Sequence, residues 1–382
     1  MNESRQQWTA LLGRRDTPTD GVEDYCSFLA RALATDGIDL QQARVQWTEK
    51  GWISALRQLS RASAEWRDRW VLLQYTAFSW SRRGFPLGAV SVLWILRRRD
   101  VRGVVVFHEQ HRQSRGSTRW IDRIRGICQD WVIHKLHKMA VKSIFTVPLE
   151  TVAWLPRQRD KAVFIPIGAN IPGRTYLRVA PTSTSKEKTI IVFGVTGSPE
   201  ATEREVHDIS GAVLEACKML GRLRLMVVGR GSVEAEDLLA SALHGSDVEL
   251  LVRGVLPAEE IADEFESADV LLFVRGAVTP QRGSVMAGIA SGIPIVGYRG
   301  ENTSSPLDDA GVEWSPWQDR ESLARGLVHV LSDPELWMEL HERNLKVYGK
   351  YFSWAIIAKQ FCKVLNANGT SFESGEGHER QR

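Results

Sequence analysis

Residues 248–274, VELLVRGVLPAEEIADEFESADVLLFV, show the pattern that decides the fold of this protein. Two apolar runs, VELLVRG (248–254) and DVLLFV (269–274), flank a segment near 257–267 that is expected to be helical. Strands that are apolar along their whole length are buried on both faces of a sheet. A strand, a helix and a second such strand therefore predict a parallel sheet with right-handed crossover connections.

The same alternation extends through the rest of the second half of the chain. Helices are expected near 200–220 and 232–244, and residues 281–297 read as a helix followed by a strand. The other expected strands are TIIVFG (189–194), LRLMVVG (223–229) and GVEW (311–314).

The first half also alternates between apolar runs and helical patterns. One expected helix follows Gly21, with Tyr25, Phe28, Leu29 and Leu33 at helical spacing. A second spans 121–142, with Ile124, Ile127, Trp131, Ile133 and Leu136 as its expected buried positions. The expected strands are WTALLG (8–13), RWVLLQY (69–75), GVVVFHE (103–109), SIFTVP (143–148) and KAVFIPIG (161–168).

The segment RVAPTSTSKEKT (178–189) interrupts this pattern with Pro, Ser, Thr and Lys, and it reads as a linker. The sequence thus predicts an α/β protein with two doubly wound, Rossmann-like domains that face a central cleft. The expected boundaries are 1–177 for the first domain, 178–188 for the linker and 189–350 for the second domain. A disordered tail is expected at 368–382.

The composition is that of a soluble globular protein, with 382 residues, 43% hydrophobic and 25% charged. The four cysteines are far apart and contain no CxxC pair, so they fit neither a disulfide framework nor a zinc site. The amino terminus lacks the apolar core of a signal peptide. The longest apolar run, Leu87 to Leu96, is about half of the ~20 residues that span a bilayer. These features predict a protein of the reducing cytosol.

The net charge of +3 conceals an asymmetry between the two halves. Residues 1–180 carry 29 Lys and Arg against 16 Asp and Glu, whereas residues 181–382 carry 20 against 30. The basic residues are scattered among Trp and Leu, so no nucleic-acid partner is expected. Arginines flank the apolar stretch 84–96, which motivates the hypothesis of peripheral contact with anionic lipid, at the inner face of the membrane, or with a polyanionic glycan. The alternative is that 87–96 is an ordinary buried helix or strand. The flanking residues are Arg82, Arg83, Arg97, Arg98 and Arg99.

Ligands of doubly wound folds bind outside the carboxyl ends of the strands, which directs attention to the loops there. In RRDTPTDGVEDYC (14–26), Pro18 and Gly21 shape a turn before a helix whose amides suit a phosphate or a sugar hydroxyl. His108 and Glu109 end an apolar strand, where a histidine is either a ligand contact or a satisfied structural residue. VVGRGS (227–232) contains a Gly-x-Gly turn, a weak signal by itself.

The segment QRGSVMAGIASGIPIVG (281–297) contains no carboxylate, histidine or cysteine. Its small residues indicate either close helix packing alone or the floor of a site that holds an anion. In the second interpretation, Gly283, Ser284 and Val285 open a helix whose free amides point at a diphosphate. Arg282 would supply a forked positive charge suited to phosphate. In the first, Arg282 is a solvated loop residue.

An ordered series of segments resembles the GT-B nucleotide-sugar glycosyltransferases, and is most similar to the large retaining family 4 (glycosyl transferases group 1). In the first half these segments are TDGVEDYCSFLARALATDGIDL, VVVFHE and FIPIGANIP. In the second half they are LMVVGRG, VRGVLPAEEIADEFESADVLLFV, ASGIPIVG and the final helix YFSWAIIAKQFCKVL (351–365). The resemblance covers nearly the whole chain.

The resemblance implies a GT-B fold, with an acceptor-side first domain, a nucleotide-sugar-binding second domain and a carboxy-terminal helix, 351–367, that crosses back to the first domain. It implies that His108 and Glu109 are catalytic and that Asp20 and Glu23 lie on the acceptor side. The implied donor-binding residues are Gly21, Gly194, Thr196, Gly229, Arg230, Arg282, Gly283, Ser284 and Val285.

The chain departs from the family at two points. The Glu-x7-Glu signature falls at Thr279 and Ala287, so both carboxylates are missing. The Arg and Lys that hold the diphosphate in the family are not recognisable in FGVTGSPEATERE (193–205), where only Arg204 is near.

The predicted function is a retaining, metal-independent glycosyltransferase that moves a sugar from a nucleotide-diphosphate sugar to a glycan, lipid-linked or other acceptor in cytoplasmic glycan assembly. No cofactor is expected beyond the nucleotide-sugar as co-substrate, and no metal. The alternative is a catalytically silent relative that binds the nucleotide-sugar or acts as a scaffolding subunit. An epimerase on the same fold is disfavoured because the resemblance follows the transferases.

Overall fold

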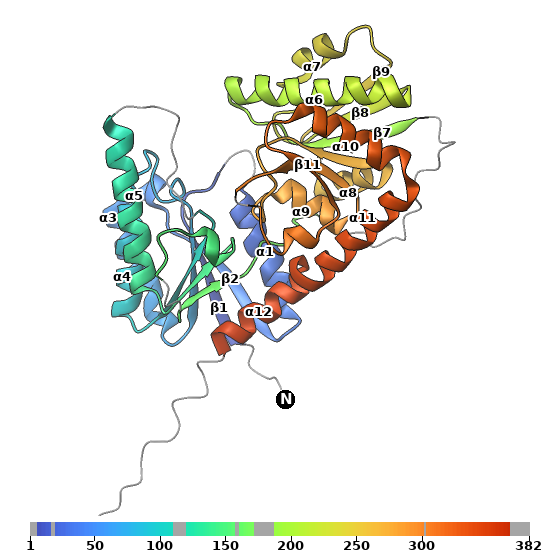
Figure 1. Ribbon diagram of the computed structural model, residues 1–382. Helices are drawn as coiled ribbons and strands as arrows, with labels where there is room; N and C mark the ends of the chain where they lie inside the picture. The colour runs from blue at the N-terminus through green and yellow to red at the C-terminus, as the bar shows by residue number, and fades with distance from the viewer. Residues whose placement is uncertain are drawn as a thin grey trace, which may run out of the picture. The chain divides into compact units, whose positions relative to one another are not determined.

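A computed structural model describes residues 6–16, 20–109, 120–156, 160–171, 187–301 and 303–366. The chain divides into two compact units (Figure 1). Unit 1 comprises Met1–Pro166 and the chain from Trp354 onwards, and unit 2 comprises Ile167–Ser353. The expected linker lies almost entirely, and the expected tail entirely, outside the described residues.

Unit 1 is a parallel α/β unit. Its helices are α1 Gly21–Ala34, α2 Trp47–Lys50, α3 Trp52–Ala62, α4 Leu87–Arg98, α5 Trp120–Met139 and α12 Trp354–Asn366, with short 3-10 turns η1 Ser63–Trp66 and η2 Leu149–Thr151. Its strands are β1 Gln6–Leu12, β2 Ile38–Arg44, β3 Trp70–Tyr75, β4 Arg102–Phe107, β5 Lys142–Phe145 and β6 Ala162–Phe164.

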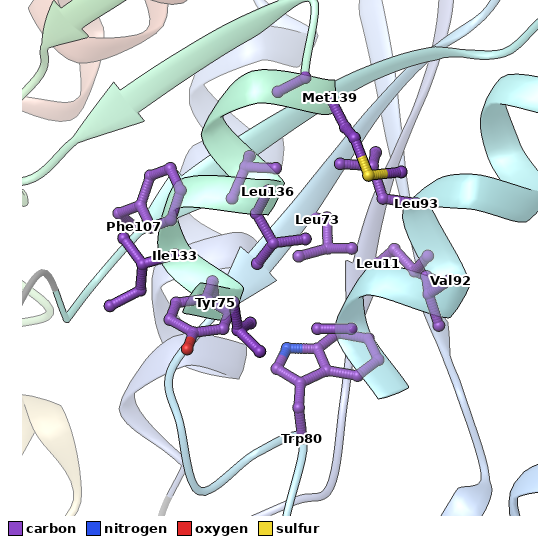
Figure 2. Packing of buried hydrophobic residues seen from close by; sticks show 14 of the residues in the cluster. Leu11, Leu73, Tyr75, Trp80, Val92, Leu93, Phe107, Ile133, Leu136 and Met139 are labelled. Carbon is purple, nitrogen blue, oxygen red and sulfur yellow. The ribbon is translucent and has the colours of Figure 1, made fainter. Parts of the chain in front are cut away.

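The strands of unit 1 form a six-stranded sheet in the order β2-β1-β3-β4-β5-β6, and all its pairs are parallel. The order reverses between β1 and β3, so the loops that follow these two strands border the crevice where ligands of such sheets bind. Helices α3, α4 and α5 cover one face of the sheet (Figure 1). Their apolar side chains meet those of β1, β3 and β4 in a close-packed core around Leu73, Trp80, Leu93 and Leu136 (Figure 2).

Helices α1 and α12 lie together on the other side of this sheet (Figure 1). The indole of Trp354, the first residue of α12, stacks on Phe28 and meets the ring of Tyr25 edge-on. Aromatic contacts of this kind add to the free energy gained from burying the rings themselves. The last described helix is thus an integral part of the first unit.

Unit 2 is a second parallel α/β unit. Its helices are α6 Pro199–Leu220, α7 Glu236–Leu243, α8 Ala258–Ser267, α9 Gly283–Ala290, α10 Arg320–Ser332 and α11 Pro334–Val347, with η3 Leu307–Asp309 and the π-helical turn η4 Tyr348–Phe352. Its strands are β7 Lys188–Phe193, β8 Leu223–Val228, β9 Val248–Gly254, β10 Val270–Phe273, β11 Ile295–Arg299 and β12 Val312–Pro316.

The sheet of unit 2 has the parallel order β12-β11-β10-β7-β8-β9. Its strand order reverses between β7 and β10, which is the arrangement of a Rossmann sheet. One core lies between the sheet and α6, α7, α10 and α11, and the other lies between the sheet and α8 and α9 (Figure 1). Because both faces are covered, inner strands such as β10 are buried along their length, as expected. The edge strand β9, with Glu249 and Arg253, is only partly buried, which corrects the expectation for 248–254.

The expected doubly wound α/β fold is confirmed in both units, and two details of the sequence prediction need correction. Strand β2 was not expected, because IDLQQAR is largely polar. In α5, Ile133 and Leu136 are buried as predicted, but Ile124, Ile127 and Trp131 are exposed. The stretch 87–96 is the helix α4, with Val92, Leu93 and Leu96 buried on its inner side.

Candidate functional site

The loops at the reversal point of the unit 2 sheet bring two arginines together. Arg275 follows β10 in the sequence, and Arg282 immediately precedes α9. The loop after the neighbouring strand β7 contains Gly194, which adopts a φ of 84°. Since β7 and β10 lie side by side, these segments share the crevice at the carboxyl edge of the sheet.

Two glycines make room for the guanidinium groups of these arginines. A Cβ on Gly194 would lie 2.8 Å from Nη1 of Arg275, and a Cβ on Gly276 would lie 3.2 Å from Nη2 of Arg282. Both glycines also have positive φ values, which L side chains rarely adopt. The backbone is therefore shaped so that two arginine side chains can lie against it.

The two guanidinium groups lie in an environment that opposes their charge. Burial lowers the pKa of Arg275, and the nearby Arg230 lowers it further, while Glu205 raises it. Burial also lowers the pKa of Arg282, although the residue is exposed overall, and repulsion from Arg275 adds to this effect. Arginine stays protonated in proteins, so these shifts mean that the groups repel one another and lack full hydration. A bound anion would relieve both penalties.

One nitrogen of Arg275 has no partner to offset its burial. Within the described part of the chain, no hydrogen-bond acceptor lies at the buried Nε of Arg275. An unpaired buried donor is costly, and such groups are uncommon in folded proteins. The Nε–H of Arg275 is therefore able to donate a hydrogen bond to an oxygen atom of a bound ligand.

Glu205 of α6 fixes the loop that follows β7. Its carboxylate accepts hydrogen bonds from the backbone N–H of Thr196 at 2.7 Å and from the Thr196 hydroxyl at 2.6 Å. Thr196 therefore uses both donors to hold its own loop. Because Glu205 is 1% exposed, its negative charge acts on the arginines through protein and not through water.

The loop after β8 is tied closely to the loop after β7. The N–H of Val195 donates to the carbonyl of Arg230 at 2.9 Å, and a Cβ on Gly231 would lie 2.2 Å from the Val195 carbonyl oxygen. Gly229, with a φ of 88°, packs against the ring of Phe193. The structure thus places Gly194, Thr196, Gly229 and Arg230 in adjoining loops, as their assignment to one binding site requires.

Helix α9 begins at Gly283, so Gly283, Ser284 and Val285 form its first turn. Its Gly288 lies against the sheet, since a Cβ there would approach Leu271 to 2.6 Å. The two interpretations of 281–297 are therefore compatible: the small residues pack the helix onto the sheet, and its amino end lies beside Arg282. Thr279 lies in the preceding loop, and Ala287 is buried within the helix.

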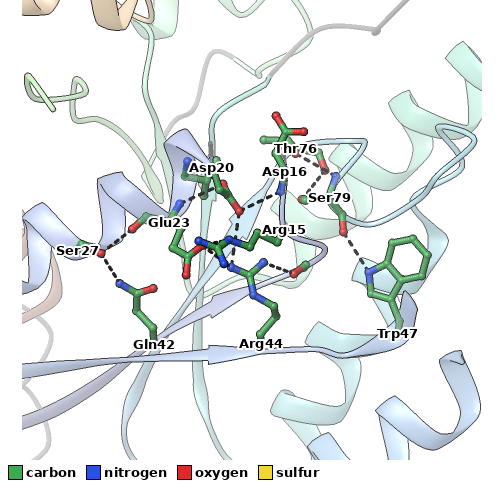
Figure 3. A network of polar contacts seen from close by, with 12 residues as sticks. Arg15, Asp16, Asp20, Glu23, Ser27, Gln42, Arg44, Trp47, Thr76 and Ser79 are labelled. Atoms are coloured by element: carbon green, nitrogen blue, oxygen red, sulfur yellow. Dashed lines mark hydrogen bonds and ion pairs between the residues drawn. The ribbon is translucent and has the colours of Figure 1, made fainter. Parts of the chain in front are cut away.

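In unit 1, the loop after β1 is organised by Asp20. One carboxylate oxygen accepts hydrogen bonds from the backbone N–H groups of Val22 and Glu23, which caps α1. The other accepts a hydrogen bond from the backbone N–H of Asp16 (Figure 3). Such a cap satisfies helix amides that would otherwise lack a partner. Asp20 thus fixes the loop shape at the start of α1, in addition to any contact with an acceptor.

Glu23 and Arg44 link this loop to the edge strand β2. Arg44 lies 3.2 Å from Glu23 and 3.6 Å from Asp20, and Arg15 lies 3.0 Å from Glu23 (Figure 3). Among the described residues, a Cβ at Gly21 would meet nothing within 4 Å, so none of them fills the space beside the amino end of α1. The loop is therefore braced by ion pairs.

The hydrogen bonds of His108 define its tautomer. Its Nε2 lies 2.8 Å from Oε1 of Gln74, while Nε2 of Gln74 donates to the carbonyl of Leu72. Because Gln74 presents its oxygen to the ring, His108 must carry its proton on Nε2. Burial lowers the pKa of His108 to about 4, and Asp20 opposes that shift. At neutral pH the ring is therefore uncharged.

Tyr25 and Glu109 complete the surroundings of His108. The ring of Tyr25 meets His108 edge-on at 4.9 Å and connects it to Trp354 of α12. The Glu109 carboxylate accepts from the backbone N–H of Ala77 at 2.8 Å, and burial raises its pKa. Glu109 therefore supports the loop after β3, the other loop that borders the crevice of this sheet.

Sequence reasoning missed Arg275, Gly276 and Glu205 in unit 2, and Gln74 and Tyr25 in unit 1. An arginine directly after a buried strand was a visible signal, but its meaning depends on the order of the strands. Within the described ranges, no group of three or more His, Cys, Asp or Glu side chains is arranged to hold a metal ion.

These two sheets, with their helices on both faces, define a GT-B fold of two Rossmann-like units. The chain is similar to sucrose-phosphate synthase from Thermosynechococcus elongatus, with a TM-score of 0.67 and 17% identity over 96% of this chain and 100% of that one. It is also similar to Anabaena HepE in complex with UDP-glucose, with a TM-score of 0.65 and 11% identity over 94% and 99% of the two chains. It is similar as well to the lipopolysaccharide outer core galactosyltransferase WaaB, with a TM-score of 0.63 and 11% identity over 95% of this chain and 100% of that one.

Comparison of the sequence itself gives no such relatives. No family profile matches it, and no curated protein sequence matches it.

Proposed function

We propose that this protein is a glycosyltransferase that moves a sugar from a nucleotide-diphosphate sugar to a hydroxyl group of a glycan or lipid-linked acceptor. The observation that carries the proposal is the pair Arg275 and Arg282 at the strand-order reversal of the unit 2 sheet. A partly buried guanidinium at Arg275 and a second at Arg282, which it repels, lie beside a helix amino end and are suited to a diphosphate. The GT-B fold and the UDP-glucose complex of HepE support this choice of ligand.

The proposed chemistry needs charge stabilisation more than a dedicated base. The bond between the sugar C1 and the phosphate oxygen breaks, and the nucleoside diphosphate leaves with increased negative charge. Arg275, Arg282 and the first amides of α9 stabilise that charge in a fixed arrangement, which costs no reorganisation during the reaction. This supplies the positive charge of the diphosphate-binding Arg and Lys that are not recognisable in FGVTGSPEATERE.

Retention of configuration follows if the acceptor approaches the same face of the sugar from which the diphosphate departs. The acceptor oxygen then forms the new bond to C1, and its proton passes to the leaving phosphate oxygen. His108, uncharged at neutral pH, is the proposed contact to the donor sugar or the acceptor and donates no proton in this reaction. The proposed reaction needs no metal ion, because the arginines neutralise the diphosphate.

The amino end of α1 in unit 1 is the proposed acceptor side, with Asp20 and Glu23 as its carboxylates and Gly21 beside them. A reducing cytoplasm is the proposed location. The four cysteines are free, in keeping with that compartment.

A panel of nucleotides and labelled nucleotide-sugars tests the proposal. We expect one nucleoside diphosphate to raise the thermal unfolding temperature, and the matching nucleotide-sugar to be hydrolysed slowly without an acceptor. Stabilisation without any release of nucleoside diphosphate, with or without acceptor glycans, would instead identify a binding protein. Release of a sugar epimer would identify an epimerase.

A further inference from the structure

Helix α5 presents a row of large apolar side chains to solvent on the outer side of unit 1. Ile124, Ile127 and Trp131 are 47%, 62% and 51% exposed, and Trp120 at the start of the helix is more exposed still. Their spacing of four, three and four residues puts all of them on one face of the helix. The opposite face, with Val132 and Leu136, already packs against the sheet, so the exposed row has no role in that core.

The neighbouring helix α4 also exposes large apolar side chains. Helices α4 and α5 pack against each other, and Trp94 and Leu87 of α4 are also about half exposed. On a monomeric protein, exposed apolar residues that gather in this way usually mark an interaction site. We call Trp94 and Arg98 of α4, with Ile124, Ile127, Trp131 and Lys135 of α5, the α4–α5 face.

Basic side chains accompany these apolar groups on the same helix faces. The guanidinium of Arg98 lies over the ring of Trp94, 3.7 Å from its centroid. Lys135 follows Trp131 by four residues and Lys138 by seven, so both lie in line with the apolar row, and both are exposed. The acidic Asp122 is half-buried and pairs with Arg125.

We propose that the α4–α5 face rests on the surface of an anionic lipid bilayer. Tryptophan and isoleucine enter the boundary between headgroups and acyl chains, while arginine and lysine reach the lipid phosphates. Among the described helices, none is long and apolar enough to cross a bilayer, so α5 would lie along the membrane surface. The proposal is independent of the proposed enzymatic activity.

The combination of positive charge and apolar side chains on this face favours an anionic bilayer over a second copy of the chain or a nucleic acid. Two copies of the chain joined through this face would bring their lysines and arginines together. A nucleic acid would use the positive charges and leave the isoleucines exposed. An anionic bilayer satisfies both kinds of side chain at once. The proposed face keeps Arg98 from the sequence hypothesis but takes its apolar groups mainly from α5, because the inner side of α4 is buried in the core of unit 1.

Vesicle flotation with the full chain tests the proposal. The probes are phosphatidylcholine vesicles with and without phosphatidylglycerol, at low and high salt. We expect binding to the anionic vesicles only, weakened at least about tenfold in the Ile124→Ser, Ile127→Ser double variant, because the lost apolar burial contributes to membrane affinity. Lys135→Gln with Lys138→Gln should remove much of the salt-sensitive part of the binding.

Matched controls lie in unit 2. Met219→Ser removes a highly exposed apolar side chain from α6, and Arg253→Gln removes an exposed charge from β9. Both should bind vesicles like the wild type. Equal binding by the isoleucine double variant, or no vesicle binding by the wild type, would overturn the proposal. So would a dimer in analytical ultracentrifugation that dissociates in that variant, because the face would then be an interface between copies.

Discussion

Gly194 lies so close to Arg275 that a Cβ on the glycine would be 2.8 Å from Nη1 of the arginine. The two residues come from the loops after β7 and β10, which meet where the strand order of the sheet reverses. A single methyl group at residue 194 would therefore move the guanidinium that we assign to the diphosphate.

Gly194→Ala should lower the affinity for the nucleoside diphosphate that stabilises the wild type. The variant also incurs strain from a φ of 84°, about 1–2 kcal/mol of folding stability. Gly221→Ala is the matched control, because Gly221 has a φ of 80° and no described residue lies within 4 Å of its Cβ position. Calorimetric titration and thermal unfolding of both variants separate the two effects. Equal nucleotide affinity in both would show that Arg275 does not need this space.

Arg275→Gln should weaken nucleoside-diphosphate binding by about 1.5–3 kcal/mol, the range for a hydrogen bond to a charged group. That is a loss of about 10- to 100-fold in affinity. Arg282→Ala should have an effect of similar size. Arg253→Gln, which removes an exposed arginine paired with Glu264, should leave the affinity unchanged. Calorimetry decides the matter, and a folded Arg275 variant with wild-type affinity would contradict the assignment.

The stability of the protein should depend on His108 in mildly acidic solution. The pKa of His108 is about 4 in the folded protein and 6.5 ordinarily, so between these values the unfolded chain binds a proton that the folded chain does not. The folded state consequently loses stability as the pH falls from 6.5 towards 4, by at most about 3 kcal/mol from this group.

His108→Gln should reduce that loss, since glutamine does not titrate. Thermal unfolding at several pH values between 7.5 and 4.5 measures the difference between wild type and variant as a function of pH. The exposed His329→Gln on α10 serves as the control. A constant difference in stability across this range would mean that His108 is not held uncharged. His108→Ala should also lose turnover while remaining folded.

Asp20 should contribute to stability chiefly as the cap of α1. Asp20→Ala removes the hydrogen bonds to Val22 and Glu23 and should cost about 1–2 kcal/mol. Asp20→Asn keeps an accepting oxygen for the cap but removes the charge near Arg44. Chemical denaturation of both variants should therefore show a smaller loss for asparagine. If the two variants were equally destabilised, the ion pair and not the cap would be the main contribution.

The local pattern of the sequence predicted most of the sheets but not their less apolar parts. Strand β2 pairs only with β1, at the edge of the sheet, and residues such as Gln41 and Gln42 remain exposed. No apolar run therefore marks it. In α5 the helical period was correct, but apolar residues lie on both sides of the helix. Periodicity alone could not say that Ile127 faces solvent and Ile133 the core.

The candidate site was predicted in part for a related reason. Gly283 and Arg282 were found because small residues and a helix start are local features. Arg275 was missed because its role depends on β10 lying beside β7, although about 80 residues separate these strands along the chain. The hydrogen bond between His108 and Gln74 also joins residues from two different segments of the chain. Neither segment of the sequence indicates this contact by itself.

The return of α12 to unit 1 has a consequence for the order in which the protein is synthesised and folded. Unit 2 is a continuous segment, Ile167–Ser353, and can fold as soon as it has left the ribosome. Unit 1 needs Trp354 to cover Phe28 and Tyr25, and this residue emerges only after all of unit 2. Until α12 is synthesised, α1 can pack on the sheet but lacks the contacts of Phe28 and Tyr25 with Trp354.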